Sequence, residues 1–212
     1  MSSQINVVLL VGLIGSGKSS IQRTFATMNV GVIESDTLAK EMIYKESNRE
    51  HLTKIFGEDV LFAKGMPNKE RIRELLFQRG KAFYKEMQSL IMSQFRAEIL
   101  TEHHAQIGRY RDGGKQLVVI EHALALRDEW ARQFSSRCVI SLHCPSSVRL
   151  GRLVKRDSRI PVTVYQSIMA AQPNDNEHMR MSEVAGTIQV DTNCTPKVMQ
   201  KKIMTLRDIV LS

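Results

Sequence analysis

INVVLLVGLIGSGKS, residues 5–19, is the stretch of sequence that decides the fold. Residues 5–11 form an aliphatic, β-branched run, which is typical of a parallel strand buried on both faces. Residues 12–19 match the pattern G-x-x-x-x-G-K-[ST] and lead into a helical segment at about residues 18–26. A strand, a glycine-rich loop and a helix in this order predict an α/β protein that binds a nucleoside triphosphate.

The residue types in this loop fit the chemistry of a triphosphate. Glycines let backbone N–H groups converge on phosphate oxygens without Cβ clashes. Lys18 supplies a mobile cation for the β- and γ-phosphates, and the Ser19 hydroxyl can ligate Mg²⁺. ATP is the expected nucleotide, although the loop does not read the base. The candidate nucleotide-binding residues of the loop are Gly12, Ile14, Gly15, Ser16, Gly17, Lys18, Ser19 and Ser20, with Ser20 expected to act as a spectator at its edge.

Apolar, β-rich segments recur at residues 30–33, 117–120 and 138–142, with a weaker fifth at 187–190. Amphipathic helical patterns separate these segments. Parallel strands joined through helices need right-handed crossovers, which cover both faces of the sheet. We therefore expect a three-layer α/β fold of the P-loop NTPase type, with a parallel five-stranded sheet.

About eighty residues separate the second strand from the third, far more than one crossover needs. We predict helices at residues 36–56, 69–78 and 80–106, because glycines and prolines punctuate the sequence between them. We expect this helical insert to bind the second substrate. The single domain, residues 1–212, is thus expected to divide into a core at 1–35 and 115–212 and a helical acceptor-binding insert at about 36–110.

Two carboxylates lie at the carboxyl ends of predicted strands, where open α/β sheets bind their ligands. Asp36 follows the second strand, where it could accept the proton of an acceptor hydroxyl or hold Mg²⁺. It also satisfies the preferences of a helix N-cap, and the two roles can coexist. Glu121 closes the third strand, where an acid can orient water on Mg²⁺. His122 beside it is expected to be polar decoration at a strand end.

The segment RLGRLVKRDSR, residues 149–159, places three arginines at positions i, i+3 and i+7, hence on one helix face. Arginines on a lid stabilise the charge that spreads over a departing phosphoryl group while they exclude water. We expect such a lid at about residues 149–172, and a solvated basic face is the alternative. The candidates are therefore Asp36, Lys18 and Arg152 for catalysis, Ser19, Asp36 and Glu121 for the metal, and Arg149 and Arg156 for the nucleotide.

Composition and charge restrict the possible partners. Thirty Lys and Arg against 22 Asp and Glu give a formal net charge of +8, which suits a nucleotide, a coenzyme or a nucleic acid. The arginines cluster in one stretch, so a local anion site for a small-molecule phosphate acceptor is favoured over a nucleic-acid surface. No apolar run approaches the roughly 20 residues of a membrane span, and residues 1–4 do not resemble a targeting peptide. We expect a cytoplasmic protein with no membrane contact.

The cysteines and histidines indicate neither a disulfide framework nor a zinc site. Cys138, Cys144 and Cys194 are odd in number and lack C-x-x-C spacing. His103 and His104 have no carboxylate or cysteine partner at a metal-ligand spacing, so we expect them on the surface.

Several segments resemble dephospho-CoA kinase, in an order and spacing that match along nearly the whole chain: GLIGSGKSS, VGVIESDTLAKEM, IFGEDVL, RLGRLVKRDSR, and IMAAQ, which ends at Gln172. The resemblance implies a P-loop kinase fold with a helical substrate-binding region and a lid. It implies ATP-dependent phosphorylation of the ribose 3′-hydroxyl of dephospho-CoA. It also implies Asp36 as the base or metal-side carboxylate, Lys18 and Ser19 at the phosphates and Mg²⁺, and Arg152 and Arg156 in the lid.

The chain departs from the family pattern mainly on the acceptor side. Glu34 stands where the family usually has Asp, and Met92-Ser93 where it has a His-Pro pair. KGMPNK, residues 64–69, replaces D-G-x-L-[DN]-R, and ALALR, residues 123–127, replaces P-L-L-F-E. Two alternatives therefore stay open: a nucleoside or nucleoside monophosphate kinase, and a nucleotide-binding subunit of a larger assembly that has lost catalysis.

Overall fold

The computed structural model describes residues 5–78, 80–122, 126, 133–134 and 136–212, which belong to two compact units. One unit contains residues 36–105, and the other contains the remainder of the described chain. Residues 123–125 and Arg127, which depart from the family pattern, lie outside the described residues. None of the described helices is long and apolar enough to cross a membrane.

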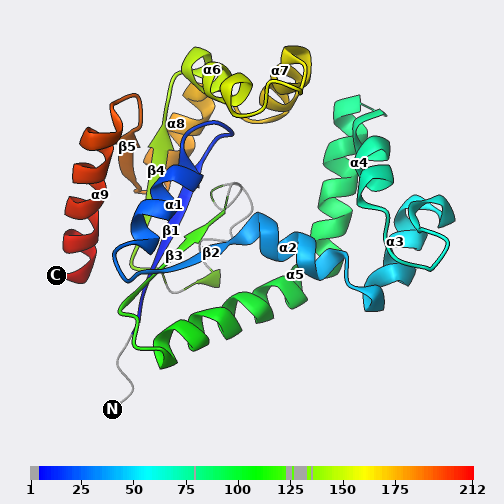
Figure 1. Ribbon diagram of the computed structural model, residues 1–212, viewed down its shortest axis with the longest axis horizontal. Helices are drawn as coiled ribbons and strands as arrows, with labels where there is room; N and C mark the ends of the chain where they lie inside the picture. The colour runs from blue at the N-terminus through cyan, green and yellow to red at the C-terminus, as the bar shows by residue number, and fades with distance from the viewer. Residues whose placement is uncertain (1–4, 79, 123–125, 127–132, 135) are drawn as a thin grey trace. The chain divides into compact units, whose positions relative to one another are not determined.

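The larger unit is built on five parallel strands in the order β2-β3-β1-β4-β5 (Figure 1). Their bounds are β1 Asn6–Gly12, β2 Gly31–Glu34, β3 Leu117–Glu121, β4 Cys138–His143 and β5 Ile188–Asp191. The predicted parallel five-stranded sheet is confirmed, including its weakest strand. Because β1 pairs with β3 on one side and β4 on the other, its carboxyl end lies at the point where the strand order switches direction, the usual ligand position in such sheets.

Helices cover both faces of this sheet: α1 Lys18–Ala26 and α9 Pro196–Leu211 on one, and α8 Asp175–Val184 on the other. α6 Ser146–Arg156 and α7 Val162–Ala171 follow β4 and lie beyond the ends of the strands (Figure 1). Leu142 of β4 packs in one apolar cluster with Phe25 of α1 and Leu206 of α9. Ser141 points to the opposite face, because side chains alternate along a strand, and its Oγ lies 2.6 Å from Ser182 Oγ of α8. The predicted three-layer arrangement is therefore confirmed.

The end of α5 (Gly80–Asp112) packs on the same face as α8, beside β2. Val32 packs against the α1 cluster, so its neighbour Gly31 faces the other way, where a Cβ would lie 2.7 Å from the Tyr110 ring. The Tyr110 hydroxyl donates to the Val32 carbonyl at 2.9 Å. The helix runs past the predicted end at residue 106 and stops at a left-handed glycine, Gly114, with a φ of 78°.

The smaller unit is helical, and its elements are α2 Ser35–Ile43, the 3-10 helices Glu46–Asn48 and Glu58–Val60, α3 Arg49–Phe56, α4 Lys69–Gln78 and the first part of α5. Leu52, Val60, Ile72 and Leu75 form its core. The predicted helix at 69–78 matches α4.

The prediction of one continuous helix at 36–56 is wrong, because the chain breaks between α2 and α3. Lys45 is extended, with a ψ of 145°, and the Asn48 side-chain amide donates to the Met42 carbonyl at 2.8 Å. Asparagine competes in this way for backbone groups that a continuing helix would use. The amphipathic period of the sequence does not reveal this break.

The expectation that His103 lies on the surface is also wrong. Its side chain is fully buried, and Nδ1 lies 2.7 Å from the Ile99 carbonyl oxygen. Phe95, Ile99 and His103 recur every four residues, so they share one buried stripe of α5. Burial lowers the pKa of His103, whereas His104 is exposed as expected.

A second buried imidazole, His178 of α8, predicts a loss of stability in acid. Its Nε2 lies 3.2 Å from Ser141 Oγ, and burial lowers its pKa from 6.5 to about 4. Between these two pKa values the unfolded chain binds the proton more readily, so stability is complete above pH 6.5 and falls as the pH approaches 4.

We expect this histidine to remove about 2–3 kcal/mol of unfolding free energy between pH 7 and pH 4.5. Urea unfolding of the wild type and of His178→Gln at both pH values measures the difference. His104→Gln, at an exposed histidine, is the matched control. Equal pH dependence in the wild type and His178→Gln would contradict the assignment.

Candidate nucleotide-binding site

The loop between β1 and α1 adopts a conformation that requires glycine. Gly15 and Gly17 have φ angles of 77° and 99°, in the left-handed region that other residues avoid. A Cβ on Gly15 would also lie 2.8 Å from the carbonyl oxygen of Arg149. Gly17, which the sequence pattern requires, is thus favoured by its backbone angle, and Gly15 is favoured both by its backbone angle and by the space around it.

Lys18 lies between the loop and an acid from the neighbouring strand. Its Nζ donates to the carbonyls of Gly12 at 2.7 Å and Leu13 at 3.3 Å, and lies 3.6 Å from Glu121 Oε1. The two charged side chains are 13% and 9% exposed. The structure therefore brings together two residues that the sequence proposed separately: the first residue of α1 and the last residue of β3.

The three serines of the loop differ in their surroundings. Ser16 is buried, and its Oγ has no hydrogen-bond partner among the described residues. Ser19 and Ser20 are exposed in the first turn of α1, where Ser20 Oγ accepts a hydrogen bond from Arg23. The loop therefore combines a buried hydroxyl without a partner among the described residues and an exposed hydroxyl, that of Ser19, at the start of α1.

Arg152 connects the loop to the end of β5 through a residue that sequence reasoning missed. Its guanidinium donates to the Thr192 carbonyl at 2.7 Å and approaches the Gly15 carbonyl at 3.5 Å. Thr192 is buried, and its hydroxyl lies 2.7 Å from the Ser16 carbonyl oxygen. The only signal in the sequence is that Thr192 lies two residues beyond the weakest predicted strand, at 187–190.

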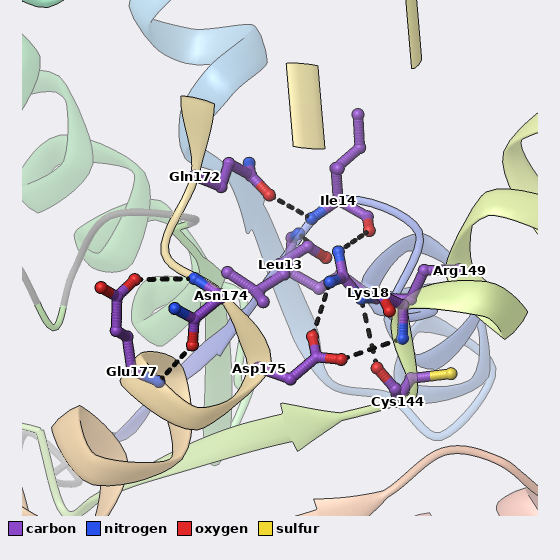
Figure 2. A network of polar contacts seen from close by, with 10 residues as sticks. Leu13, Ile14, Lys18, Cys144, Arg149, Gln172, Asn174, Asp175 and Glu177 are labelled. Carbon is purple, nitrogen blue, oxygen red and sulfur yellow. Dashed lines mark hydrogen bonds and ion pairs between the residues drawn. The ribbon is translucent and has the colours of Figure 1, made fainter. Parts of the chain in front are cut away.

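Arg149, expected on a lid that meets the nucleotide, lies instead in a buried network, which also differs from the alternative of a solvated basic face. It is only 3% exposed, and Nη2 donates to Asp175 Oδ1 at 2.6 Å while Nη1 donates to the Ile14 carbonyl at 3.1 Å (Figure 2). Nε donates to the Cys144 carbonyl at 3.2 Å. Arg156, at the end of α6, is exposed. The three arginines therefore do not share one open surface.

The far end of the predicted lid also meets the loop. Gln172 follows α7, and its Oε1 accepts a hydrogen bond from the Ile14 backbone N–H at 2.9 Å (Figure 2). Asn174 caps α8 through a reciprocal pair of hydrogen bonds with Glu177, which holds Asp175 at the first position of that helix. Sequence reasoning singled out neither Asp175 nor the cap.

The remaining carboxylates lie at the end of β2. Glu34 is the last residue of β2 and is paired in register with Glu121 of β3. Asp36 is exposed in the first turn of α2 and belongs to the helical unit. Its expected part in catalysis stays a prediction.

A pocket of about 390 Å³ opens beside the loop, at the carboxyl ends of β4 and β5. Apolar side chains such as Leu13, Pro145 and Met179 line it together with His143 and His178. Burial lowers the pKa of both imidazoles. Burial therefore favours the neutral form of both rings that the pocket presents beside the loop.

Comparisons with known proteins agree with this geometry. The family model described as dephospho-CoA kinase matches residues 6–194. The chain is 29% identical over 178 residues to a dephospho-CoA kinase of Methylococcus capsulatus, with 84% of each chain covered. It is 27% identical over 203 residues to one of Pasteurella multocida, covering 94% of this chain and 92% of the relative.

Solved structures show the same fold. TT1252 from Thermus thermophilus superimposes with a TM-score of 0.75 at 18% identity, covering 99% of both chains. A dephospho-CoA kinase from Campylobacter jejuni gives a TM-score of 0.60 at 16% identity, covering 97% of both chains.

Because Lys18 lies beside Glu121, we expect the effects of replacing these two residues on the unfolding free energy to depend on each other. Lys18→Met removes a positive charge beside a nearly buried carboxylate, so we expect about 1–3 kcal/mol less unfolding free energy. The double variant Lys18→Met/Glu121→Gln removes both charges and should recover part of this loss. Lys201→Met, at an exposed position of α9, is the control for charge removal. Urea unfolding at pH 7 measures these proteins together with the single variant Glu121→Gln, which completes the cycle. A loss in the double variant that equals the sum of the two single losses would contradict the coupling.

Proposed function

This chain belongs to the dephospho-CoA kinase family, and from that membership we propose that it transfers the γ-phosphoryl group of ATP to the ribose 3′-hydroxyl of dephospho-CoA. The observation that carries the proposal is the family match across residues 6–194, which includes the loop, the strand-end carboxylates and the arginine segment. The folded loop supports it, because Gly15, Gly17 and Lys18 have the conformation and contacts that a phosphate-binding loop needs.

The loop would bind the triphosphate through backbone N–H groups and the positive end of α1. Helix N-termini favour anions because their first N–H groups have no partner within the helix. Lys18 Nζ would move from the carbonyls of Gly12 and Leu13 toward the β- and γ-phosphates. Arg152 and Arg156 would approach the same phosphates from α6 and neutralise the charge that spreads over the transferred group.

The residues beside the loop also fit a magnesium ion. Ser19 presents a hydroxyl and Glu121 a carboxylate, and oxygen donors are the ligands that Mg²⁺ prefers. The described part of the chain holds no group of three or more His, Cys, Asp or Glu side chains that could hold a metal ion by itself. Such a sparse set suits Mg²⁺, which usually keeps several waters and takes one or two carboxylates along with substrate phosphates. When bound, the ion neutralises phosphate charge.

On the acceptor side, the segment at residues 64–69 departs from the family pattern but still forms a turn that caps a helix. Residues 64–69 form a turn with Gly65 at a φ of 77°, and Asn68 Oδ1 accepts the Arg71 backbone N–H at the start of α4. Asn68 stands where the family pattern has Asp or Asn, so the helix cap remains. This supports a local turn that keeps its helix cap although its sequence has changed.

Asp36 is the proposed acceptor of the hydroxyl proton, and its replacement tests this role. We expect Asp36→Asn to lower kcat by about 10²- to 10⁴-fold, because a positioned base contributes that much to a proton transfer. Binding of ATP should stay within about twofold of the wild type. Glu41→Gln, an exposed change in the same helix, is the control. Steady-state kinetics and nucleotide titration measure both effects, and turnover within about threefold of the wild type would contradict the role.

An acceptor panel separates the proposed function from its alternatives. We expect Mg²⁺-dependent ADP formation with dephospho-CoA, and coenzyme A as the product identified by mass spectrometry. Turnover only with nucleosides or nucleoside monophosphates would show a different kinase. Binding of ATP without turnover on any acceptor would show a nucleotide-binding subunit.

A further inference from the structure

Ile14, at the apex of the phosphate-binding loop, has both polar main-chain atoms held by distant side chains. Its N–H donates to Gln172 Oε1 at 2.9 Å, and its carbonyl accepts from Arg149 Nη1 at 3.1 Å (Figure 2). These partners lie 158 and 135 residues away in the sequence. The conformation of the apex therefore depends on side chains outside the loop.

The two hydrogen bonds set the direction of two peptide planes. In a trans peptide the carbonyl and the following N–H point in opposite directions. Because the Ile14 carbonyl points to Arg149, the Gly15 N–H points away from Arg149. The preceding plane is reversed: Ile14 N–H points out to Gln172, and the Leu13 carbonyl points into the loop, where it accepts from Ser16 N at 3.1 Å and Lys18 Nζ at 3.3 Å. The alternation places the Gly15 N–H on the inner side.

Gly15 is the residue of the loop whose own backbone preferences constrain this arrangement of peptide planes least. Its φ of 77° is accessible to glycine together with many other conformations. The Ile14–Gly15 peptide can therefore turn over at low cost unless a contact holds it. A turned peptide would direct a carbonyl oxygen, instead of an N–H, at a phosphate group, and repel it.

The contacts of Arg149 hold the Ile14–Gly15 peptide in place. Its guanidinium is immobilised by three acceptors, and the Asp175 carboxylate that pairs with it also accepts the Ser146 backbone N–H through Oδ2, at 2.9 Å. A planar guanidinium can bond the carbonyls of Ile14 and Cys144 and the carboxylate of Asp175 at once, whereas a lysine ammonium on a flexible stem has no such fixed fork.

We propose that Arg149 and Asp175 form a positioning pair for the nucleotide: they hold the Ile14 carbonyl outward and thereby direct the Gly15 N–H at the bound triphosphate. Arg149 then acts through the Ile14–Gly15 peptide rather than by touching the phosphates. This inference rests on the nucleotide binding proposed above and adds a requirement to it.

Nucleotide binding without any acceptor tests the pair. We expect Arg149→Lys and Asp175→Asn each to raise the Kd for Mg·ATP by about 10- to 100-fold, the effect of losing one well-directed bond to a charged group. Lys155→Met, an exposed change on the same helix, should stay within about twofold. Titrations are made well below each protein's melting temperature, so that only folded protein is measured. A wild type that does not bind Mg·ATP would overturn the proposed function, whereas equal Kd values in the wild type and Arg149→Lys would overturn the pairing alone.

The Gly15 N–H can also be observed directly. Gly15 and Gly108 are the two glycines that follow an isoleucine, so labelling isoleucine with ¹³C and glycine with ¹⁵N isolates their two amide signals. We expect Mg·ATP to shift the Gly15 signal of the wild type strongly and to leave that of Gly108, in α5, unchanged. In nucleotide-saturated Asp175→Asn or Arg149→Lys the Gly15 shift should be smaller. A full wild-type shift in both variants would overturn the proposal even if their affinity were reduced, because their Gly15 N–H would still reach the phosphate. If one variant fails to fold, the other completes the test.

Discussion

The structure depends on one constraint: the loop after β1 lies outside regular secondary structure, so its carbonyls must find hydrogen-bond donors elsewhere. A buried carbonyl without a donor costs free energy comparable to a lost hydrogen bond. Each carbonyl from residue 12 to residue 16 has a side-chain donor. The pairs are Gly12 and Leu13 with Lys18, Ile14 with Arg149, Gly15 with Arg152, and Ser16 with Thr192.

The order of the strands brings these donors to the loop. β4 pairs directly with β1, and Leu142 lies opposite Gly12, so the helix that follows β4 begins beside the loop. β3 pairs with β1 on the other side and ends at Glu121, which meets Lys18. Thr192 follows β5, one strand farther out. A loop at the switch point of the sheet is thus supported from both sides, whereas a loop at an edge strand would have neighbours on one side only.

Much of this fold could be predicted from the sequence, because its strands and its loop are determined locally. Apolar, β-rich segments mark four strands, and a weaker one marks the fifth. The loop pattern also requires glycine at residue 17, where the φ angle is positive. The prediction failed where a single side chain overrides the periodicity, as Asn48 does between α2 and α3. It also missed Asp175 and Thr192, whose contacts with Arg149 and Ser16 join residues 26 and 176 positions apart. Neither spacing nor composition encodes such pairs.

The arginines of α6 show most clearly where a sequence pattern stops being informative. Their spacing places Arg149, Arg152 and Arg156 on one helix face, but that face runs from the packed base of the helix to its exposed end. The first side chain is buried, the second is half-buried and the third is exposed. Because burial immobilises a side chain and exposure leaves its rotamers accessible, the same residue type is suited to holding backbone at one end and to meeting a ligand at the other. A periodic pattern identifies which residues share a helix face, whereas the burial of each side chain determines whether it can hold backbone or meet a ligand.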